Sequence, residues 1–403
     1  MALIIGMNSG SSFDGIDAVL AEISIAPDGH PAKPKFIDGI AYPWRDDVAQ
    51  LVLRGFANEL SIFELTRLNY VAGAVYAEAA RALLDKTSVR PEDVQVIGVD
   101  GQTIYQEPPD HAGMRALPKD VSLVDQWLNG PYPCGLQIGE ASLIAAFTNI
   151  TTVTQFRPAD HAFGGTGAPL MQYLDFVAFR DVAPLLTLNI GGIANCHLVN
   201  RDRSKMMAFD TGPGNVMLDH AARKLFQRAY DPDGMLAAQG QVQADMLADL
   251  MGHPYFQRKP PRSAWRLDFG AAYADGMLEK YATRRAEDLM ATFCAFTADA
   301  IVKSINDYIP DLSGLNVLIA SGGGVRNKTL MQMLQARLPK HMRLTTSDEY
   351  GIPAQFKEAI KFATLGFATL EHFADNIPAC SGASQFNILG KIALAPRYAR
   401  GIN

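Results

Sequence analysis

The 403-residue chain has few of the features that mark metal-binding or redox proteins. Its four cysteines lie far apart and form no C-x-x-C pair, so the sequence predicts free thiols rather than a zinc or redox site. The eight histidines are equally scattered, and none belongs to an H-E-x-x-H motif. Any bound metal is therefore expected to have oxygen ligands.

Long apolar runs and blocks of one charge are also missing. No run of 18 or more apolar residues occurs, which argues against a transmembrane helix. The N-terminal stretch MALIIGMNSG has no basic segment, so we expect no secretory signal and a cytoplasmic protein. The net charge of −6, with no Lys/Arg-rich block, argues against nucleic-acid binding. We expect small-molecule partners, and neither nucleic acid nor membrane.

The sequence does contain repeated strand patterns that end in glycine-rich polar residues. A hydrophobic content of 48% is ordinary for a globular protein, and the length favours two domains. Five short apolar segments end in this way: ALIIGMNSG, VQVIGVDGQT, LLTLNIGGIAN, MMAFDTGPGN and NVLIASGGGVRN. Because long helical patterns separate them, we predict an α/β fold whose functional groups lie at strand ends.

Helix signals and a coarse repeat give an outline of the domains. Ser61 and Glu64 have capping-box spacing at the start of a long helical pattern, and Asn215 is a candidate cap for another helix. A strand, a glycine turn and a second strand occur near residue 10 and again near residue 191. We predict an N-terminal domain of residues 1–150 with 376–403 and a C-terminal domain of residues 151–375. The proline-rich residues 252–270 are expected to be a loop.

Three glycine-rich strand ends are candidate phosphate-binding loops. The segment SGSSFDG after the first strand is either a hairpin turn or a loop that binds phosphate through amides and hydroxyls. NIGGIAN has the same two interpretations, whereas SGGGVRN, between a strand and a helix, favours a ligand against bare backbone. No G-x-x-x-x-G-K-[ST] pattern occurs in the chain, which excludes a P-loop NTPase.

Two carboxylates are candidates for the chemistry. Asp210 ends an apolar strand in FDTGPGN, where it either caps its own turn or serves as a general base. Glu358, in KEAIKF, is either a solvated helix residue or a Mg²⁺ ligand. Glycine-rich strand ends in both halves, with aspartates and no Walker motif, are typical of a two-domain kinase that binds ATP between its domains.

The chain resembles the anhydro-N-acetylmuramic acid kinases, including the related levoglucosan kinases, nearly end to end. The motifs that carry the resemblance are NSGSSFDGID, GQTI, QIGE, FRPAD, GGTGAPL, NIGGIAN, FDTGPGN, YDPDG, SGGGVRN, DEYGIP with Glu358, and GAS near residue 382. The resemblance implies two ribonuclease-H-like domains of the actin, Hsp70 and sugar-kinase type around an ATP cleft. It also implies a homodimer.

The resemblance further implies roles for individual residues. ATP would be bound by the first hairpin and the other glycine-rich turns: Ser9, Gly10, Ser11, Ser12, Asp14, Gly15, Asn189, Gly191, Gly192, Gly322, Gly323, Gly324 and Asn327. Asp210 and Glu358 would be catalytic, and Asp14 with Glu358 would hold Mg²⁺. The sugar would be bound by Gln102, Arg157, Asp160, Asn215 and Trp265.

The implied reaction couples hydrolysis to phosphorylation. Asp210 would take a proton from water, the water would attack the anomeric carbon, and the freed O6 would receive the γ-phosphoryl group of ATP. The substrate would be 1,6-anhydro-N-acetylmuramic acid from cell-wall recycling. Levoglucosan or another anhydro-sugar is an alternative, as are a plain hydroxyl kinase and a non-catalytic sugar- or nucleotide-sensing relative.

The alternatives stay open because the chain departs from the common family motifs. Family members commonly have S-H-G-Q-T-I where this chain has Asp100, D-F-R where it has Gln155, and G-G-Q-G-A-P where it has Thr166. The S/T-T-G-R-E pattern of the long loop is replaced by residues 263–267, SAWRL. Trp265 in that loop either stacks on a sugar face or packs under its own loop. These changes predict a substrate that differs from the usual one.

Overall fold

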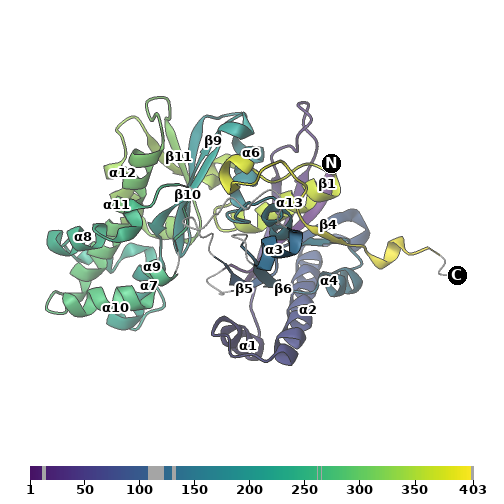
Figure 1. Ribbon diagram of the computed structural model, residues 1–403, viewed down its shortest axis with the longest axis horizontal. Helices are drawn as coiled ribbons and strands as arrows, with labels where there is room; N and C mark the ends of the chain where they lie inside the picture. Colours follow the sequence, from purple (N-terminus) through teal and green to yellow (C-terminus); the bar gives the residue numbers. More distant parts are fainter. Residues whose placement is uncertain (11–14, 108–121, 129–132, 261, 265, 401–403) are drawn as a thin grey trace. The chain divides into compact units, whose positions relative to one another are not determined.

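The computed structural model describes residues 1–403 except 11–14, 108–121, 129–132, 261, 265 and 401–403 (Figure 1). The chain forms two compact units, which we describe separately. The first unit comprises Met1–Asp181 and Gly351–Asn403, and the second comprises Val182–Tyr350. None of the helices in the described part of the chain combines the length and apolarity needed to cross a bilayer.

The first unit is built on a six-stranded sheet of order β13-β7-β4-β1-β2-β3. Its strands are β1 (Ala2–Asn8), β2 (Ile16–Ile23), β3 (Lys35–Tyr42), β4 (Val94–Val99), β7 (Thr152–Thr154) and β13 (Lys391–Ala393). Strands β1 to β3 form an antiparallel meander, and β4 and β7 extend the sheet parallel to β1. A separate hairpin pairs β5 (Gln102–Gln106) with β6 (Gly135–Ile138).

The helices of the first unit follow the sequence signals closely. They are α1 (Asp46–Phe56), α2 (Ile62–Thr87), η1 (Pro91–Asp93), α3 (Leu123–Leu128), α4 (Ala141–Thr148), α5 (Arg157–His161), α6 (Met171–Phe179), α13 (Lys357–Leu370), α14 (Pro378–Ser381) and η8 (Pro396–Tyr398). The predicted capping box at α2 is confirmed: Ser61 accepts from the Glu64 amide, and the Glu64 carboxylate accepts from the Ser61 amide. Buried α2 residues such as Leu68 and Leu83 pack in the core of this unit.

The units divide the chain differently from the predicted boundaries at residues 150 and 375. Helix α13 packs directly on β1 and β4 (Figure 1): a Cβ added at Gly6 would lie 2.0 Å from the Ala359 carbonyl oxygen. A Cβ at Gly98 would lie 1.9 Å from the Phe362 carbonyl oxygen. The two glycines let a helix from far along the chain lie against the sheet. The chain therefore returns from the second unit to the first after Tyr350, before α13 begins.

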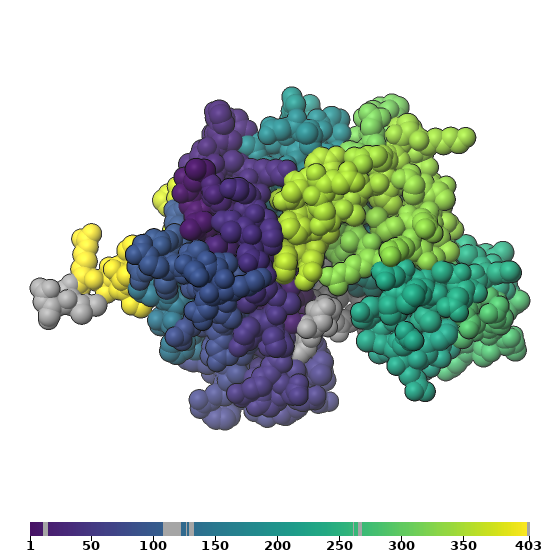
Figure 2. Space-filling view, turned by 180° about the vertical axis from the view of Figure 1, so that it is seen from behind, coloured from purple at the N-terminus to yellow at the C-terminus, as the bar shows by residue number. Residues whose placement is uncertain are grey.

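The C-terminal segment returns to the first unit, as the sequence predicted. Arg397 donates to the carbonyl oxygens of Pro91 and Val94 at 2.8 Å each, and its amide donates to the Asn149 side chain. Figure 2 shows the yellow C-terminal residues against the blue residues of this unit. The contact fixes the segment around Arg397 beside the start of β4.

The second unit repeats the same sheet with other residues. Its five strands have the order β10-β9-β8-β11-β12: β8 (Leu185–Ile190), β9 (Ile193–Val199), β10 (Met207–Pro213), β11 (Val317–Ser321) and β12 (Arg343–Thr346). Strands β8 to β10 form the antiparallel meander, and β11 and β12 run parallel to β8. Two sheets of this order and direction confirm the prediction of a ribonuclease-H-like fold present twice in the chain.

The second unit also contains α-helices and short 3₁₀ helices. They are η2 (Arg203–Lys205), α7 (Val216–Phe226), η3 (Pro232–Gly234), η4 (Ala237–Gln239), α8 (Ala244–Met251), η5 (Pro254–Gln257), α9 (Arg266–Phe269), α10 (Ala271–Lys280), α11 (Ala286–Tyr308), η6 (Gly323–Arg326), α12 (Lys328–Arg337) and η7 (Ser347–Tyr350). Leu186, Leu188 and Phe209 of the sheet share one core with Phe293 of α11. The expectation of a plain loop over 252–270 is wrong in part, because η5 and α9 lie inside it.

Candidate functional site

Polar side chains follow the parallel strands of the first unit at one edge of its sheet. Asn8 ends β1, Asp100 follows β4, and Thr154 ends β7. Because these three strands are parallel, their carboxyl ends meet at the same edge. The Thr154 hydroxyl donates to the Asp100 carbonyl oxygen at 3.5 Å. This edge is where an α/β sheet places its ligands.

Three of the predicted site residues belong to one hydrogen-bonded group at this edge. The Ser9 hydroxyl donates to Gln102 Oε1 at 2.6 Å and accepts from Trp44 Nε1 at 3.0 Å. Asn8 Nδ2, next to Ser9, donates to Glu358 Oε2 at 2.9 Å. Ser9 and Gln102 are both buried. The group fixes the start of the first loop relative to the Glu358 carboxylate.

The rest of the first loop is described only at its ends. Gly10 and Gly15 are half-buried, and a Cβ at Gly15 would lie 3.3 Å from the Tyr42 carbonyl oxygen. The predictions for Ser11, Ser12 and Asp14 lie outside the described residues.

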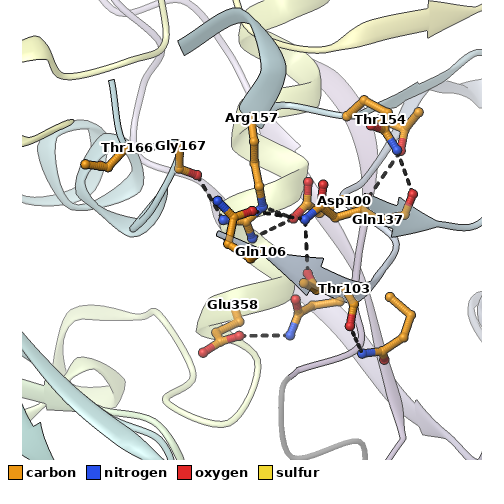
Figure 3. A network of polar contacts seen from close by, with 12 residues as sticks. Asp100, Thr103, Gln106, Gln137, Thr154, Arg157, Thr166, Gly167 and Glu358 are labelled. Carbon is orange, nitrogen blue, oxygen red and sulfur yellow. Dashed lines mark hydrogen bonds and ion pairs between the residues drawn. The ribbon is translucent and has the colours of Figure 1, made fainter. Parts of the chain in front are cut away.

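The Arg157 side chain donates hydrogen bonds to other residues of the first unit, as Figure 3 shows. Its Nε and Nη2 donate to Asp100 Oδ2 at 2.9 and 2.7 Å, and its Nη1 donates to the Gly167 carbonyl oxygen at 2.9 Å. The side chains are 15% and 4% exposed, so the pair is shielded from water. The contact joins β4 to the glycine-rich segment at residues 164–167.

Asp160 holds that segment from the other side. Its buried carboxylate accepts from the Gly167 amide at 2.9 Å, from Asn376 Nδ2 at 3.2 Å and from the Ser381 hydroxyl at 2.9 Å. A Cβ at Gly165 would lie 2.1 Å from Asp160 Oδ2, which explains why a glycine stands there. These contacts give Asp160 a structural role, and its predicted contact with sugar stays a prediction.

In the second unit, the glycine turns after β8 and β10 pack on each other. The Gly214 amide donates to the Gly192 carbonyl oxygen at 2.9 Å, and the Asn215 amide donates to that of Gly191 at 2.8 Å. Asn215 precedes α7 as predicted, but its side chain does not cap the helix. Its Nδ2 instead donates to the Ile190 carbonyl oxygen at 3.4 Å.

The SGGG segment after β11 approaches the end of β8 closely. A Cβ at Gly322, where φ is +85°, would lie 2.8 Å from Asn189 Oδ1. A Cβ at Gly324 would lie 2.3 Å from the Ile190 side chain, whereas Gly323 is open, with its nearest such neighbour 4.0 Å away. Asn189 is therefore brought together with SGGG, whereas the predicted Gly191 and Gly192 pack on Gly214. The Asn327 amide donates to the Gly324 carbonyl oxygen at 3.1 Å, while its side chain caps α12 by accepting from the Leu330 amide at 2.9 Å.

Asp210 is held by the long loop that follows α8. Its Oδ2 accepts from the Ala264 amide at 2.8 Å, and its carbonyl oxygen accepts from the Tyr255 hydroxyl at 2.6 Å. Burial raises the pKa of the Asp210 carboxyl to about 7, against the opposing effects of the Ala264 amide and the Arg262 charge. The Asp210 carboxylate thus accepts a hydrogen bond from residue 264, in a loop far along the chain from its own turn.

Asp210 has a neighbour on the next strand that the sequence patterns did not predict as a site residue. Asn195 of β9 lies directly opposite Asp210 in the antiparallel register. Its Oδ1 is buried and has no hydrogen-bond partner in the described part of the chain. The NIGGIAN motif contains Asn195, so its strand register is the signal that would have found it.

Comparison with known proteins places the whole chain in one family. Residues 2–395 match the family model described as anhydro-N-acetylmuramic acid kinase. An anhydro-N-acetylmuramic acid kinase of Caldanaerobacter subterraneus is 34% identical over 97% of each chain. Those of Clostridioides difficile and Francisella tularensis are 36% and 35% identical, covering 97% and 96% of this chain and 98% and 97% of their own.

The chain belongs to the anhydro-N-acetylmuramic acid kinase family. Among solved structures, component A of (R)-2-hydroxyglutaryl-CoA dehydratase from Acidaminococcus fermentans covers 92% of this chain and 100% of its own. Its TM-score is 0.45 at 11% identity, a likeness too weak to carry an argument.

Against the common motifs of the anhydro-N-acetylmuramic acid kinase family, three departures make contacts within the first unit. Asp100 pairs with Arg157. The Gln155 amide, at a residue with φ of +56°, donates to the Gln137 carbonyl oxygen at 2.7 Å, a bond that a carboxylate cannot donate. The Thr166 hydroxyl donates to the Ala168 carbonyl oxygen at 2.6 Å. The prediction for Trp265 lies outside the described residues.

The cavity in the first unit lies beside one of these departures. It has a volume of 570 Å³, and its lining includes Gln155, Gln137, Glu140 and Lys391. Glu140 caps α4 by accepting from the Ser142 amide at 3.0 Å. The polar groups of this wall are thus engaged in holding α4 and β6.

Helix α13 carries a second charged residue that the sequence analysis overlooked. Lys361 is only 8% exposed and lies three residues after Glu358, on the same side of the helix. Its ammonium lies 4.2 Å from the centre of the Phe362 ring. Burial lowers the pKa of Lys361, and the nearby Glu358 opposes that shift. The three-residue spacing of Glu358 and Lys361 in KEAIKF would have predicted that the two charges lie close together on the helix.

Proposed function

We propose that this protein is an ATP-dependent kinase that hydrolytically opens 1,6-anhydro-N-acetylmuramic acid and phosphorylates its O6. Family membership supports the kinase class and the sugar. The observation that carries the chemistry is Asp210, whose carboxyl has a pKa raised by burial to about 7 and whose Oδ2 is anchored by the Ala264 amide. A base with this pKa accepts protons efficiently near neutral pH.

The proposed steps balance without any further reactant. Asp210 takes one proton from water as the water oxygen bonds to the anomeric carbon, and the bond from that carbon to O6 breaks. The freed O6 then bonds to the γ-phosphorus of ATP, and ADP leaves. The Ala264 amide keeps one carboxylate oxygen in place, so the other oxygen is available to the water.

ATP recognition is assigned to the glycine-rich strand ends. In the second unit, Gly322 and Gly324 pack so closely on Asn189 and Ile190 that a side chain would collide, whereas Gly323 between them is exposed. In the first unit, Ser9 begins the loop to which phosphate binding is assigned. Exposed backbone amides after strands are groups that bind phosphate oxygens.

Mg²⁺ is assigned to Glu358 and Asp14. Within the described residues, no group of three His, Cys, Asp or Glu side chains is placed to hold a metal. That fits Mg²⁺, which uses one or two carboxylates together with substrate phosphates and waters. When bound, the ion would neutralise charge on the phosphates, while Asn8 orients the Glu358 carboxylate through its 2.9 Å hydrogen bond.

A second candidate substrate is another anhydro-sugar such as levoglucosan. It is favoured by the departures from the family motifs, above all the SAWRL sequence of residues 263–267. Ala264 is itself such a departure, yet its bond to Asp210 uses the backbone amide and does not depend on the side chain. The base is thus retained while the loop sequence has changed.

We also propose that the protein is a cytoplasmic homodimer.

The test is ATP consumption and phosphosugar formation with a panel of anhydro- and free sugars. We expect ATP-dependent phosphorylation of 1,6-anhydro-N-acetylmuramic acid, with levoglucosan as the competing substrate and the free sugars inactive. Equal or higher rates with the free sugars would support a plain hydroxyl kinase. ATP binding without turnover of any sugar would support a non-catalytic relative.

A further inference from the structure

Arg262 is a buried cation enclosed by two aromatic rings in the second unit. Its side chain lies with the guanidinium carbon 4.6 Å from the ring centre of Tyr255 and 4.7 Å from that of Tyr308. Only 3% of the residue is exposed. Such a site selects a planar guanidinium, because both faces stack while the edge remains free to donate hydrogen bonds.

The edge of this guanidinium points at the backbone of the base. Arg262 Nε donates to the Asp210 carbonyl oxygen at 3.0 Å, and the Asp210 amide donates to the Arg262 carbonyl oxygen at 3.2 Å. Arg262 Nη2 donates to the Ser304 hydroxyl at 2.6 Å. The Ser304 hydroxyl in turn donates to the Thr211 carbonyl oxygen at 3.0 Å. One side chain therefore ties α11 to the strand that carries Asp210.

The same contacts also hold the backbone amide that donates a hydrogen bond to the Asp210 carboxylate. Ala264, whose amide donates to Asp210 Oδ2, follows Arg262 by two residues. With the Arg262 carbonyl and guanidinium both bound to Asp210, the intervening backbone has little freedom to move the amide away. The orientation of the carboxylate thus depends on a residue that does not touch the carboxylate itself.

The charges around Asp210 make Arg262 its main electrostatic neighbour. No ion pair joins Arg262 to a carboxylate in the part of the chain that the structure describes. Nearby, Tyr255 of η5 and Tyr308 of α11 contribute uncharged phenols, and Arg258 is paired with Asp268 at 2.7 Å. The uncompensated positive charge lowers the pKa of Asp210 against the effect of burial.

We propose that Arg262 is the positioning residue of the catalytic base: it orients the Asp210 carboxylate through the backbone and favours its ionised form. The proposal rests on the proposed function for its link to turnover, but not for its effect on Asp210. Without Arg262, the carboxyl would be protonated at neutral pH and the Ala264 amide would be displaced.

The first experiment measures the Asp210 carboxyl directly, by ¹³C NMR titration of the full chain, with Asp210→Asn to assign the signal. Arg262→Met should raise the Asp210 pKa by about 1 unit, because the variant lacks the positive charge that opposes the effect of burial. Arg262→Lys keeps the charge and should leave the pKa near its wild-type value. Arg258→Met, which removes a cation stacked on the same Tyr255 ring, is the matched control and should leave it unchanged.

The second experiment measures kcat and KM against pH. Arg262→Met should lower kcat at pH 7 by about 10²-fold, with partial recovery at higher pH, while Arg262→Lys should lower kcat at every pH. ATP affinity should not change.

The proposal is overturned if the folded Arg262→Met variant has the same Asp210 pKa as the wild type. It is also overturned if Arg262→Lys has the kcat of the wild type. If Arg262→Met does not fold, Arg262→Lys decides. If the wild type turns over no sugar, the proposed function fails while the titration still tests Arg262.

Discussion

The sheets of the two units have the same order of strands in their common part, but their strands end in different ways. In the first unit the strand ends carry side chains that bind one another, such as Asp100 with Arg157 and Asn8 with Glu358. In the second unit the strand ends carry glycines that bring backbones together, and Asp210 is the carboxylate held among them. The same order of strands therefore supports a charged side-chain network in one unit and closely packed glycine turns beside the Asp210 carboxylate in the other.

This difference shows that the repeated strand order determines where functional groups lie. The residues that follow each strand determine which contacts those groups can make. A side-chain network resists change because each member satisfies another in a buried setting. Backbone contacts tolerate changes of side chain, as Ala264 illustrates. The predictions below test whether the chemistry is divided between the units in this way.

The largest effect is expected for Asp210→Asn, which removes the proton acceptor and keeps the size. Turnover should fall by about 10²–10⁴-fold while ATP affinity stays at the wild-type value. Initial rates and calorimetry of nucleotide binding measure the two quantities together. Asp307→Asn, in an exposed pair with Lys303, is the control. Turnover close to that of the wild type would remove Asp210 from the mechanism.

The pH dependence of kcat/KM should reflect the same carboxyl. Burial raises the pKa of Asp210 to about 7, and only the ionised carboxylate accepts a proton. The rate should therefore rise tenfold per pH unit below pH 7 and level off above it. A profile that is flat from pH 5 to pH 7 would contradict a base with this pKa.

In the first unit, Glu358→Gln should raise the Mg²⁺ concentration required for half-maximal rate by several-fold. A neutral amide is a poorer ligand than a carboxylate for a hard cation. A magnesium titration of the activity measures the shift. Glu371→Gln, at the other end of the same helix, is the matched control. Titration curves that superimpose for wild type and Glu358→Gln would count against the metal role.

The smallest and most selective effect is expected for Trp265→Ala. If the indole stacks on the sugar, kcat/KM should fall for the preferred anhydro-sugar and ATP affinity should not change. The comparison uses 1,6-anhydro-N-acetylmuramic acid and levoglucosan, with Trp127→Ala on the exposed face of α3 as control. No change with either sugar would mean that Trp265 packs under its own loop.

Local patterns were enough to predict several elements and the places where strands end. The Ser61 and Glu64 capping box and the long helix ending at Tyr308 follow from short-range rules that the structure obeys. The strand ends were predictable because apolar runs stop at glycine and polar residues. Such signals need no knowledge of distant contacts.

Contacts between distant segments could not be predicted from these patterns. The compact units divide the chain at other residues than the predicted domains, because α13 lies on β1 and β4 through Gly6 and Gly98, a fit that only the folded backbone reveals. Arg262 touches Asp210 across 52 positions in the sequence. Asp160 resembles a substrate ligand in sequence, yet its carboxylate binds the segment around Gly167. In each case the partner, rather than the residue type, sets the role.

The most direct test of the account is the fate of the water oxygen. Product made in ¹⁸O-labelled water should carry the label at the anomeric carbon and none in the transferred phosphoryl group, because Asp210 activates water for attack on the sugar. The analysis must be fast or the position trapped, since a reducing sugar exchanges this oxygen. Label at the anomeric carbon at early times is the predicted result. Its absence there, with a phosphorylated product, would contradict the coupled reaction.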